Sequence, residues 1–102
     1  MYNAYTAFMR VDWDSQKAKS NLIKYGVSFE EAAEVFDDPL HLSTLDLRFE
    51  YLEERWITVG MSHGRRLLVV ANLFFNDQME EVTRIISARE ATKNEQKQYE
   101  DV

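Results

Sequence analysis

The residues best suited to chemistry lie near the C-terminus, in the run from Val82 to Thr92. The run has the β-branched composition of a strand, with Arg84 inside it and Arg89 at its end, just before a helix start. Guanidinium groups on a rigid strand suit phosphate binding, because their planar fork matches two phosphate oxygens and keeps its charge. We therefore interpret Arg84 and Arg89 as candidate phosphate ligands in an otherwise acidic chain.

The distribution of charge is more informative than its sum. The chain has a net charge of −6, and the acidic surplus lies in residues 1–54, which hold 5 basic and 11 acidic side chains. From Arg55 to Phe75 there are three arginines and no carboxylate. The acidity argues against broad non-specific binding to nucleic acid, but it allows a locally positive face or a basic partner over the acidic half.

Composition indicates one globular domain over residues 1–102, with residues 1–8 either an aromatic extension or an upstream start. There is no cysteine, and His41 and His63 lack the spacing of a metal site, so we expect no disulfide, metal or other cofactor. No apolar run reaches the length of a membrane span and no signal peptide is evident. We expect a cytoplasmic protein without membrane contact.

The elements that must position the arginines begin with a short strand over residues 9–13. Asp14 can cap a helix over 15–25, and Gly26 can end it. Ala18 and Leu22 then lie on one face of this helix.

A second helix follows at once. Ser28 and Glu31 have the spacing of a capping box, and apolar residues recur at helical intervals from Phe29 to Phe36, before Pro39 ends the helix. The short connection predicts a helical hairpin.

The remainder of the chain has the period of strands. It predicts four of them, over residues 41–46, 55–61, 65–74 and 81–87. Turns at 62–64 and 76–77 would join the last three into a meander, and a capping box at Thr92 opens a polar helix to about Asp101. The expected fold class is α+β: a small antiparallel sheet with an N-terminal helical hairpin, a C-terminal helix and the helices on one face.

Many segments from about Val11 to Tyr99 match one known family in order and spacing. They are Trp13-Asp14, Lys17, Asn21-Leu22, Lys24, Gly26 to Ala32, Val35-Phe36, Asp38-Pro39, Glu53 to Ile57, Gly60, Arg66 to Val70, Arg84 to Arg89, Ala91-Thr92, Glu95 and Tyr99. The chain resembles the BrnT family of bacterial toxins. It departs from the family at Tyr25, where many members have histidine.

The resemblance implies a RelE-like ribonuclease fold and the role of toxin in a type II toxin–antitoxin system. The implied activity is metal-independent cleavage of RNA, which inhibits translation. The implied partner is a BrnA-like antitoxin of the ribbon-helix-helix class, which neutralises the toxin in a dimer or heterotetramer. Contact with DNA would then occur only through the antitoxin.

RNA cleavage without a metal needs a base for the 2′-hydroxyl, stabilisation of charge on the phosphorane and an acid for the 5′-oxygen. Arginines suit the second task, and a lysine or glutamate can move the protons. The candidate catalytic residues are Arg55, Arg84, Arg89, Lys24 and Glu54. Side chains that could hold the substrate are Arg66, Ser87 and Tyr25.

Each charged candidate also has a structural explanation. Arg84 could pair with an acid such as Glu53, Arg55 could form a surface ion pair, and Lys24 could complement the helix dipole. The nuclease hypothesis requires the arginines to converge on an open patch of sheet without salt-bridge partners. The alternative is a catalytically weak or inactive binding module in a repressor complex, which Tyr25 and the acidity favour; a plain structural domain is a third reading.

Overall fold

One twisted sheet forms the frame of the protein in the computed structural model, which describes residues 2–5, 9–48, 50 and 52–100. Its strands are β1 (Tyr2–Tyr5), β2 (Arg10–Trp13), β3 (Leu42–Leu45), β4 (Trp56–Met61), β5 (Leu67–Asp77) and β6 (Glu80–Glu90). Their order across the sheet is β1-β2-β6-β5-β4-β3. The helices are α1 (Ser15–Tyr25), α2 (Phe29–Glu34), continued by a 3-10 turn (Val35–Asp37), and α3 (Lys93–Glu100).

The sheet confirms the predicted β4-β5-β6 meander and corrects one other expectation. β2 lies parallel to β6, with Asp12 opposite Arg84, so the sheet is not wholly antiparallel. The long excursion through α1, α2 and the meander allows this, because parallel neighbours need a long connection. Residues 2–5, within the aromatic lead, form a strand antiparallel to β2, while 6–8 lie outside the described residues.

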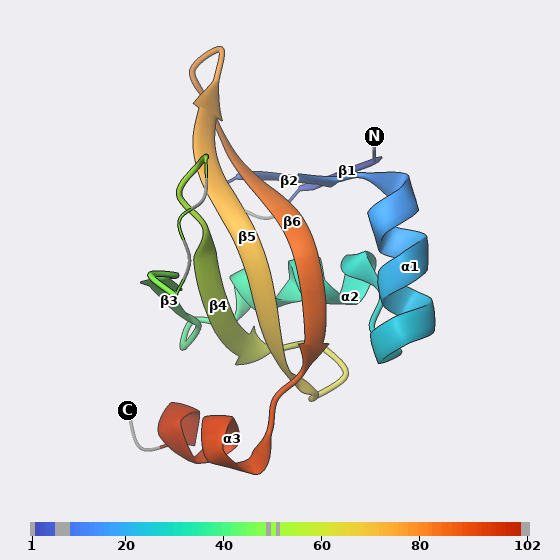
Figure 1. Cartoon of the computed structure of the whole chain (residues 1–102), viewed down its shortest axis with the longest axis vertical. Coiled ribbons are helices and arrows are strands. Elements are labelled where there is room, and N and C mark those ends of the chain that lie inside the picture. Colours follow the sequence, from blue (N-terminus) through green and yellow to red (C-terminus); the bar gives the residue numbers. More distant parts are fainter. Residues whose placement is uncertain (1, 6–8, 49, 51, 101–102) are drawn as a thin grey trace.

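The predicted starts of α1 and α2 and the end of α1 are confirmed, whereas α2 gives way to the 3-10 turn at Val35, before Pro39 is reached. Asp14 Oδ1 accepts from the backbone N–H of Gln16 at 2.7 Å, and Gly26 ends α1 at φ 70°, a conformation that glycine adopts without strain. Ser28 Oγ accepts from the N–H of Glu31 at 3.0 Å. The two helices cover one face of the sheet but cross rather than lie side by side, so the helical hairpin is not confirmed (Figure 1).

The C-terminal helix α3 is not on the same face as α1 and α2. Glu95, Gln98 and Tyr99 line a groove with Ile57 and other residues of β3 and β4 whose side chains point away from the core. The expectation that all helices share one face is therefore wrong for α3, because the chain leaves β6 toward the opposite side (Figure 1). None of the described helices is long and apolar enough to cross a membrane.

The hairpin between β5 and β6 turns two residues later than predicted. The strands extend to Asp77 and Glu80, and the turn is made by Gln78 and Met79 at φ 50° and 69°. Positive φ at both central residues matches the right-handed twist of the flanking strands. Asn76 attracted the prediction because asparagine is a common turn residue, yet it lies within β5 opposite Glu81.

The core lies between the sheet and the pair α1–α2. The apolar positions predicted for the second helix are buried, including Phe29, which meets Trp13 edge-on at 6.2 Å between ring centroids. The buried cluster comprises Val11, Trp13, Val27, Phe29, Ala32, Ala33, Val35, Phe36, Leu68, Val70, Ile85 and Ala88.

Of the apolar face predicted for α1, Ala18 packs against the core but Leu22 does not, and the fully buried residue of the helix is polar. Leu22 is half exposed, whereas Asn21 is buried and replaces a neighbouring strand beside Ala88. Asn21 Nδ2 donates to the carbonyls of Val27 at 2.9 Å and Ala88 at 2.8 Å, and Asn21 Oδ1 accepts from the N–H of Ala88 at 3.0 Å. One carboxamide thus satisfies three backbone groups that would otherwise be buried without partners.

We expect Asn21→Ala to lower the free energy of unfolding by about 2–4 kcal/mol, because it leaves these backbone groups buried without hydrogen-bond partners. Leu22→Ala is the matched control and should cost about 0.5 kcal/mol or less. Urea denaturation of the two variants measures the difference. Equal losses would mean that the carboxamide does not anchor α1.

Ser28→Ala should cost about 1 kcal/mol through loss of the cap on α2. Ser28 caps a helix and is not one of the candidate site residues, so activity per folded molecule should be unchanged. Urea denaturation gives the first quantity and an RNA cleavage assay the second. A variant that folds normally but loses turnover would contradict the placement of the site.

Candidate active site

A β-bulge in β6 decides which side chains share a face. Ser87 pairs with Ala71 and Ile85 pairs with Asn72, so Ile86 is an extra residue. In a regular strand, residues five positions apart point to opposite faces. The extra residue cancels that alternation and places Arg84 and Arg89 on the same face.

This face, opposite α1 and α2, is termed the arginine face. Its members belong to β6, the middle of β5 and the start of β4. They are Arg55, Ile57, Val69, Ala71, Leu73, Arg84, Ser87 and Arg89. Two hollows open on it, one around Arg84 and one around Arg89.

The first, termed the Arg84 hollow, has a volume of about 550 Å³. It gathers charged side chains from three parts of the chain: Asp14 and Lys17 at the start of α1, Glu53, Glu54 and Arg55 before β4, and Arg84 from β6. Glu54, Arg55 and Arg84 are predicted site residues. Lys17 was not predicted, although it belongs to the segments that carry the family resemblance.

Arg84 is held by a carboxylate behind it. Its Nε and Nη2 donate to Asp12 Oδ1 and Oδ2 at 2.9 and 3.1 Å, and its guanidinium lies 4.9 Å from the ring centroid of Phe75. Asp12 is almost fully buried, and its hydrogen bond raises the pKa of Arg84. The suggested pairing of Arg84 with Glu53 is wrong, because β2 places Asp12 opposite Arg84. Two of the five guanidinium donors are engaged, which fixes the group without covering it.

Arg55 stands beside Arg84 in the same hollow. Its Nε lies 3.6 Å from Glu53 Oε1. About a third of the Arg55 side chain and half of the Glu53 side chain are exposed, so water weakens this pair.

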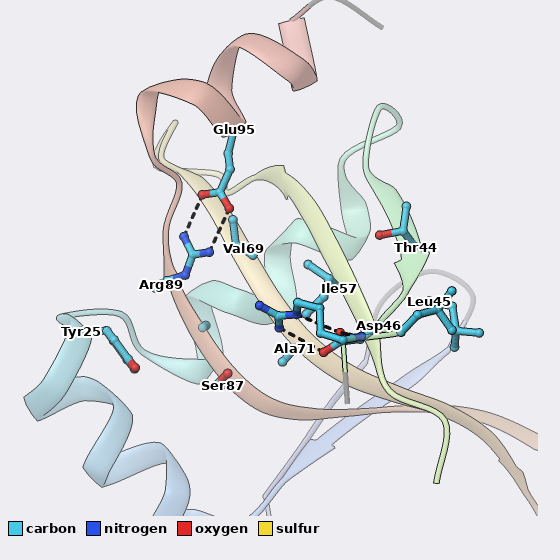
Figure 2. Close-up of a pocket in the computed structure, with 13 residues that line it drawn as sticks. Tyr25, Thr44, Leu45, Asp46, Ile57, Val69, Ala71, Ser87, Arg89 and Glu95 are labelled. Atoms are coloured by element: carbon cyan, nitrogen blue, oxygen red, sulfur yellow. Dashed lines mark hydrogen bonds and ion pairs between the residues drawn. The ribbon is translucent and has the colours of Figure 1, made fainter. Parts of the chain in front are cut away.

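The second, termed the Arg89 hollow, has a volume of about 390 Å³. Figure 2 shows Tyr25 and Ser87 on one side of it and Asp46 on the other, with Arg89 held by Glu95 of α3. Arg89 Nη1 and Nη2 donate to Glu95 Oε1 and Oε2 at 2.8 and 2.9 Å. This bond raises the pKa of Arg89 and lowers the pKa of Glu95 to about 2.

A second ion pair in the Arg89 hollow was missed by the sequence reasoning. Arg48 Nε and Nη2 donate to Asp46 Oδ1 and Oδ2 at 2.9 and 3.1 Å. Both residues border a charged connection after β3, where alternation gives no signal. Only the fold brings them to the wall of the hollow.

Two predicted residues lie outside both hollows. The ammonium of Lys24 lies 5.2 Å from the ring centroid of Tyr25, near the end of α1. Arg66 lies at the β4–β5 hairpin, where its Nε donates to Glu31 Oε2 at 2.9 Å and its Nη2 donates to Glu31 Oε1 and to the carbonyl of Gly26. Glu31, predicted to close the capping box, is instead the partner of Arg66.

The predicted convergence of partner-free arginines is therefore wrong. Arg55 and Arg84 line one hollow, Arg89 lines the other, and Arg66 is elsewhere. Each of the four has a carboxylate within 4 Å. In an acidic chain, half-buried guanidinium groups gain from such partners, since ionised hydrogen bonds are strong where water is scarce. An incoming phosphate would meet oriented arginines rather than an unpaired cluster. The described residues include no group of three histidine or acidic side chains placed to hold a metal ion.

Fold and site together define a small α+β protein with a charged site on the open face of its sheet. A family model described as the ribonuclease toxin, BrnT, of type II toxin–antitoxin systems matches residues 13–95, and the chain belongs to this family. Its fold is similar to the 1.1 Å crystal structure of the Brucella abortus ribonuclease toxin, BrnT, with a TM-score of 0.54 and 21% identity over 81% of this chain and 96% of that one. No curated protein sequence matches the chain.

We expect the Arg89–Glu95 pair to make stability depend on pH. The pKa of Glu95 falls from its usual 4.5 to about 2 in the folded protein, so its contribution is complete above pH 4.5 and is lost as the pH falls toward 2. Glu95→Gln should be less stable than wild type at pH 7, and the difference should shrink between pH 4.5 and 2. Urea denaturation across this range measures it. In a protein that already carries Arg89→Ala, the stability difference caused by Glu95→Gln should no longer vary with pH over this range. If it varied as before, Arg89 would not be the cause of the lowered pKa of Glu95.

Proposed function

We propose that this chain is the toxin of a type II toxin–antitoxin pair and that it cleaves RNA in the Arg84 hollow without a metal. The arginines do not converge free of carboxylate partners, so they no longer carry the nuclease hypothesis by themselves. The activity is proposed instead on membership of a ribonuclease toxin family. The observation that carries the location is that Lys17, Glu54, Arg55 and Arg84 line one hollow of about 550 Å³. A base, an acid and two phosphate ligands are thus present together.

The proposed roles follow from the chemistry of the groups. Arg55 and Arg84 hold the scissile phosphate and stabilise the charge that builds on the phosphorane. Glu54 takes the proton of the 2′-hydroxyl as the 2′-oxygen bonds to phosphorus, and Lys17 gives a proton to the 5′-oxygen as its bond to phosphorus breaks. The products are a 2′,3′-cyclic phosphate and a 5′-hydroxyl end.

The Arg89 hollow would hold the adjoining part of the RNA. Arg89 and Arg48 offer charge, and Ser87 and Tyr25 offer hydroxyls, on the same face as the Arg84 hollow. RNA phosphates must compete there with Glu95 and Asp46, which supports weak binding rather than a tight pocket. We propose no step for Lys24 or Arg66, which lie outside both hollows.

The wider role is proposed on the family membership. A type II toxin has a protein antitoxin, which we take to be a BrnA-like ribbon-helix-helix protein that silences the toxin and binds their operon. Cleavage of messenger RNA would inhibit translation, which places the action in the cytoplasm, and the sheet with two helices on one face is compatible with a RelE-like fold.

A second candidate is a catalytically weak or inactive binding module in a repressor complex. One observation favours it: a carboxylate lies within 4 Å of each arginine candidate. Tyr25 in place of the family histidine points the same way.

An assay of RNA cleavage by the purified chain in the presence of EDTA distinguishes the ribonuclease from the inactive binding module. The wild type should cut the RNA. Glu54→Gln should slow cleavage by about 100- to 10,000-fold and Arg55→Ala by about 100- to 1,000-fold, because they remove the base and a charge-stabilising group. Glu30→Gln, on the exposed side of α2, is the matched control and should cleave normally. Intact RNA with folded wild-type protein would favour the binding module.

A further inference from the structure

An exposed apolar strip follows one edge of the sheet. β3 is the last strand on this side, and Figure 1 shows it at the margin of the sheet. The strip, termed the leucine edge, consists of Leu40, Leu42, Leu45 and Leu47, with exposed fractions of 71%, 47%, 36% and 81%. Leu42 pairs with Val59 and Leu45 with Trp56, so these two leucines lie on opposite faces of β3 and apolar side chains flank the edge on both faces. A segment that extends the sheet here could cover leucines on either face.

The backbone of the edge is also available for pairing. The N–H of Asp46 donates to the carbonyl of Arg55 at 2.7 Å, and bonded pairs alternate along an antiparallel ladder. Leu42 and Thr44 therefore bond to β4, while the N–H and C=O groups of Ser43 and Leu45 point away from the sheet. An extended segment can add here as a further strand.

The charge around the strip specifies the kind of partner. Residues 37–54 hold six carboxylates and a single basic side chain, Arg48, and so carry nearly all of the net charge of −6. A second copy of this chain or an RNA strand would bring like charges together, whereas a basic segment would be attracted.

A groove beside the strip can take apolar side chains. It has a volume of about 260 Å³ and lies between α3 and β3–β4, with walls that include Leu40, Leu42, Val59 and Tyr99. Tyr99 Oη donates to Asp38 Oδ2 at 2.6 Å, which holds α3 over the groove.

We propose that the leucine edge is the docking surface of the protein antitoxin, which adds a basic, alternately apolar segment to β3 and places its apolar side chains in the groove. The inference rests on the toxin role in the proposed function and not on the catalytic assignments. Leu45, Asp46 and Leu47 also line the Arg89 hollow, so a segment on this edge would stand beside the arginine face and obstruct RNA.

The test uses the protein encoded by the reading frame adjacent to that of this chain, purified separately. Calorimetry should show binding to wild type that weakens with salt. The double variant Leu40→Ser/Leu42→Ser should weaken it at least tenfold. Leu22→Ser/Ile23→Ser on α1, where the side chains are 52% and 88% exposed, is the matched control and should bind as wild type does. Thermal denaturation checks that both variants fold.

Amide hydrogen exchange gives a second measurement. Exchange at Ser43 and Leu45 should slow at least tenfold in the complex. The proposal is overturned if the adjacent protein does not bind, if both double variants bind alike, if these amides stay unprotected, or if the chain dimerises through this edge. Binding at the edge by a chain that cleaves no RNA would leave this proposal standing and refute the catalytic one.

Discussion

The contact between Asn21 and Ala88 is the interaction on which the site depends most. β2 covers the edge of β6 only as far as Ile85, and beyond it the Asn21 carboxamide takes the place of a strand by bonding both backbone groups of Ala88. This fixes α1 against β6. Since α1 supplies Lys17 to the Arg84 hollow and Tyr25 to the Arg89 hollow, one buried amide sets the position of both.

The carboxylates behind the arginines hold the guanidinium groups in a fixed orientation but weaken their attraction for a distant phosphate. Asp12 holds two donors of Arg84 and Glu95 holds two of Arg89. A guanidinium fixed in this way loses little freedom when it meets a phosphate, which favours positioning. Its field at a distance is weaker, so affinity for RNA must come from contacts at short range.

The protein has two surfaces that suit different partners: one suits RNA and the other a protein segment. The arginine face carries guanidinium groups with local acid partners, whereas residues 37–54 carry acids beside exposed leucines. The two surfaces meet at the Arg89 hollow, whose wall is shared between β6 and the segment after β3. A partner bound at the leucine edge therefore lies next to the arginine face, which is proposed to bind RNA.

The sequence by itself determined α1, α2, α3 and the β4-β5-β6 meander, because caps at Asp14, Ser28 and Thr92 and the apolar period are local signals. The order and spacing of its motifs also indicated the family. The tertiary structure decided the rest: the bulge at Ile86 that puts Arg84 and Arg89 on one face, the burial of Asn21 instead of Leu22, and the pairing of Arg84 with Asp12, 72 residues away. Such features depend on strand register and on which elements meet in space, and neither leaves a pattern between neighbouring residues.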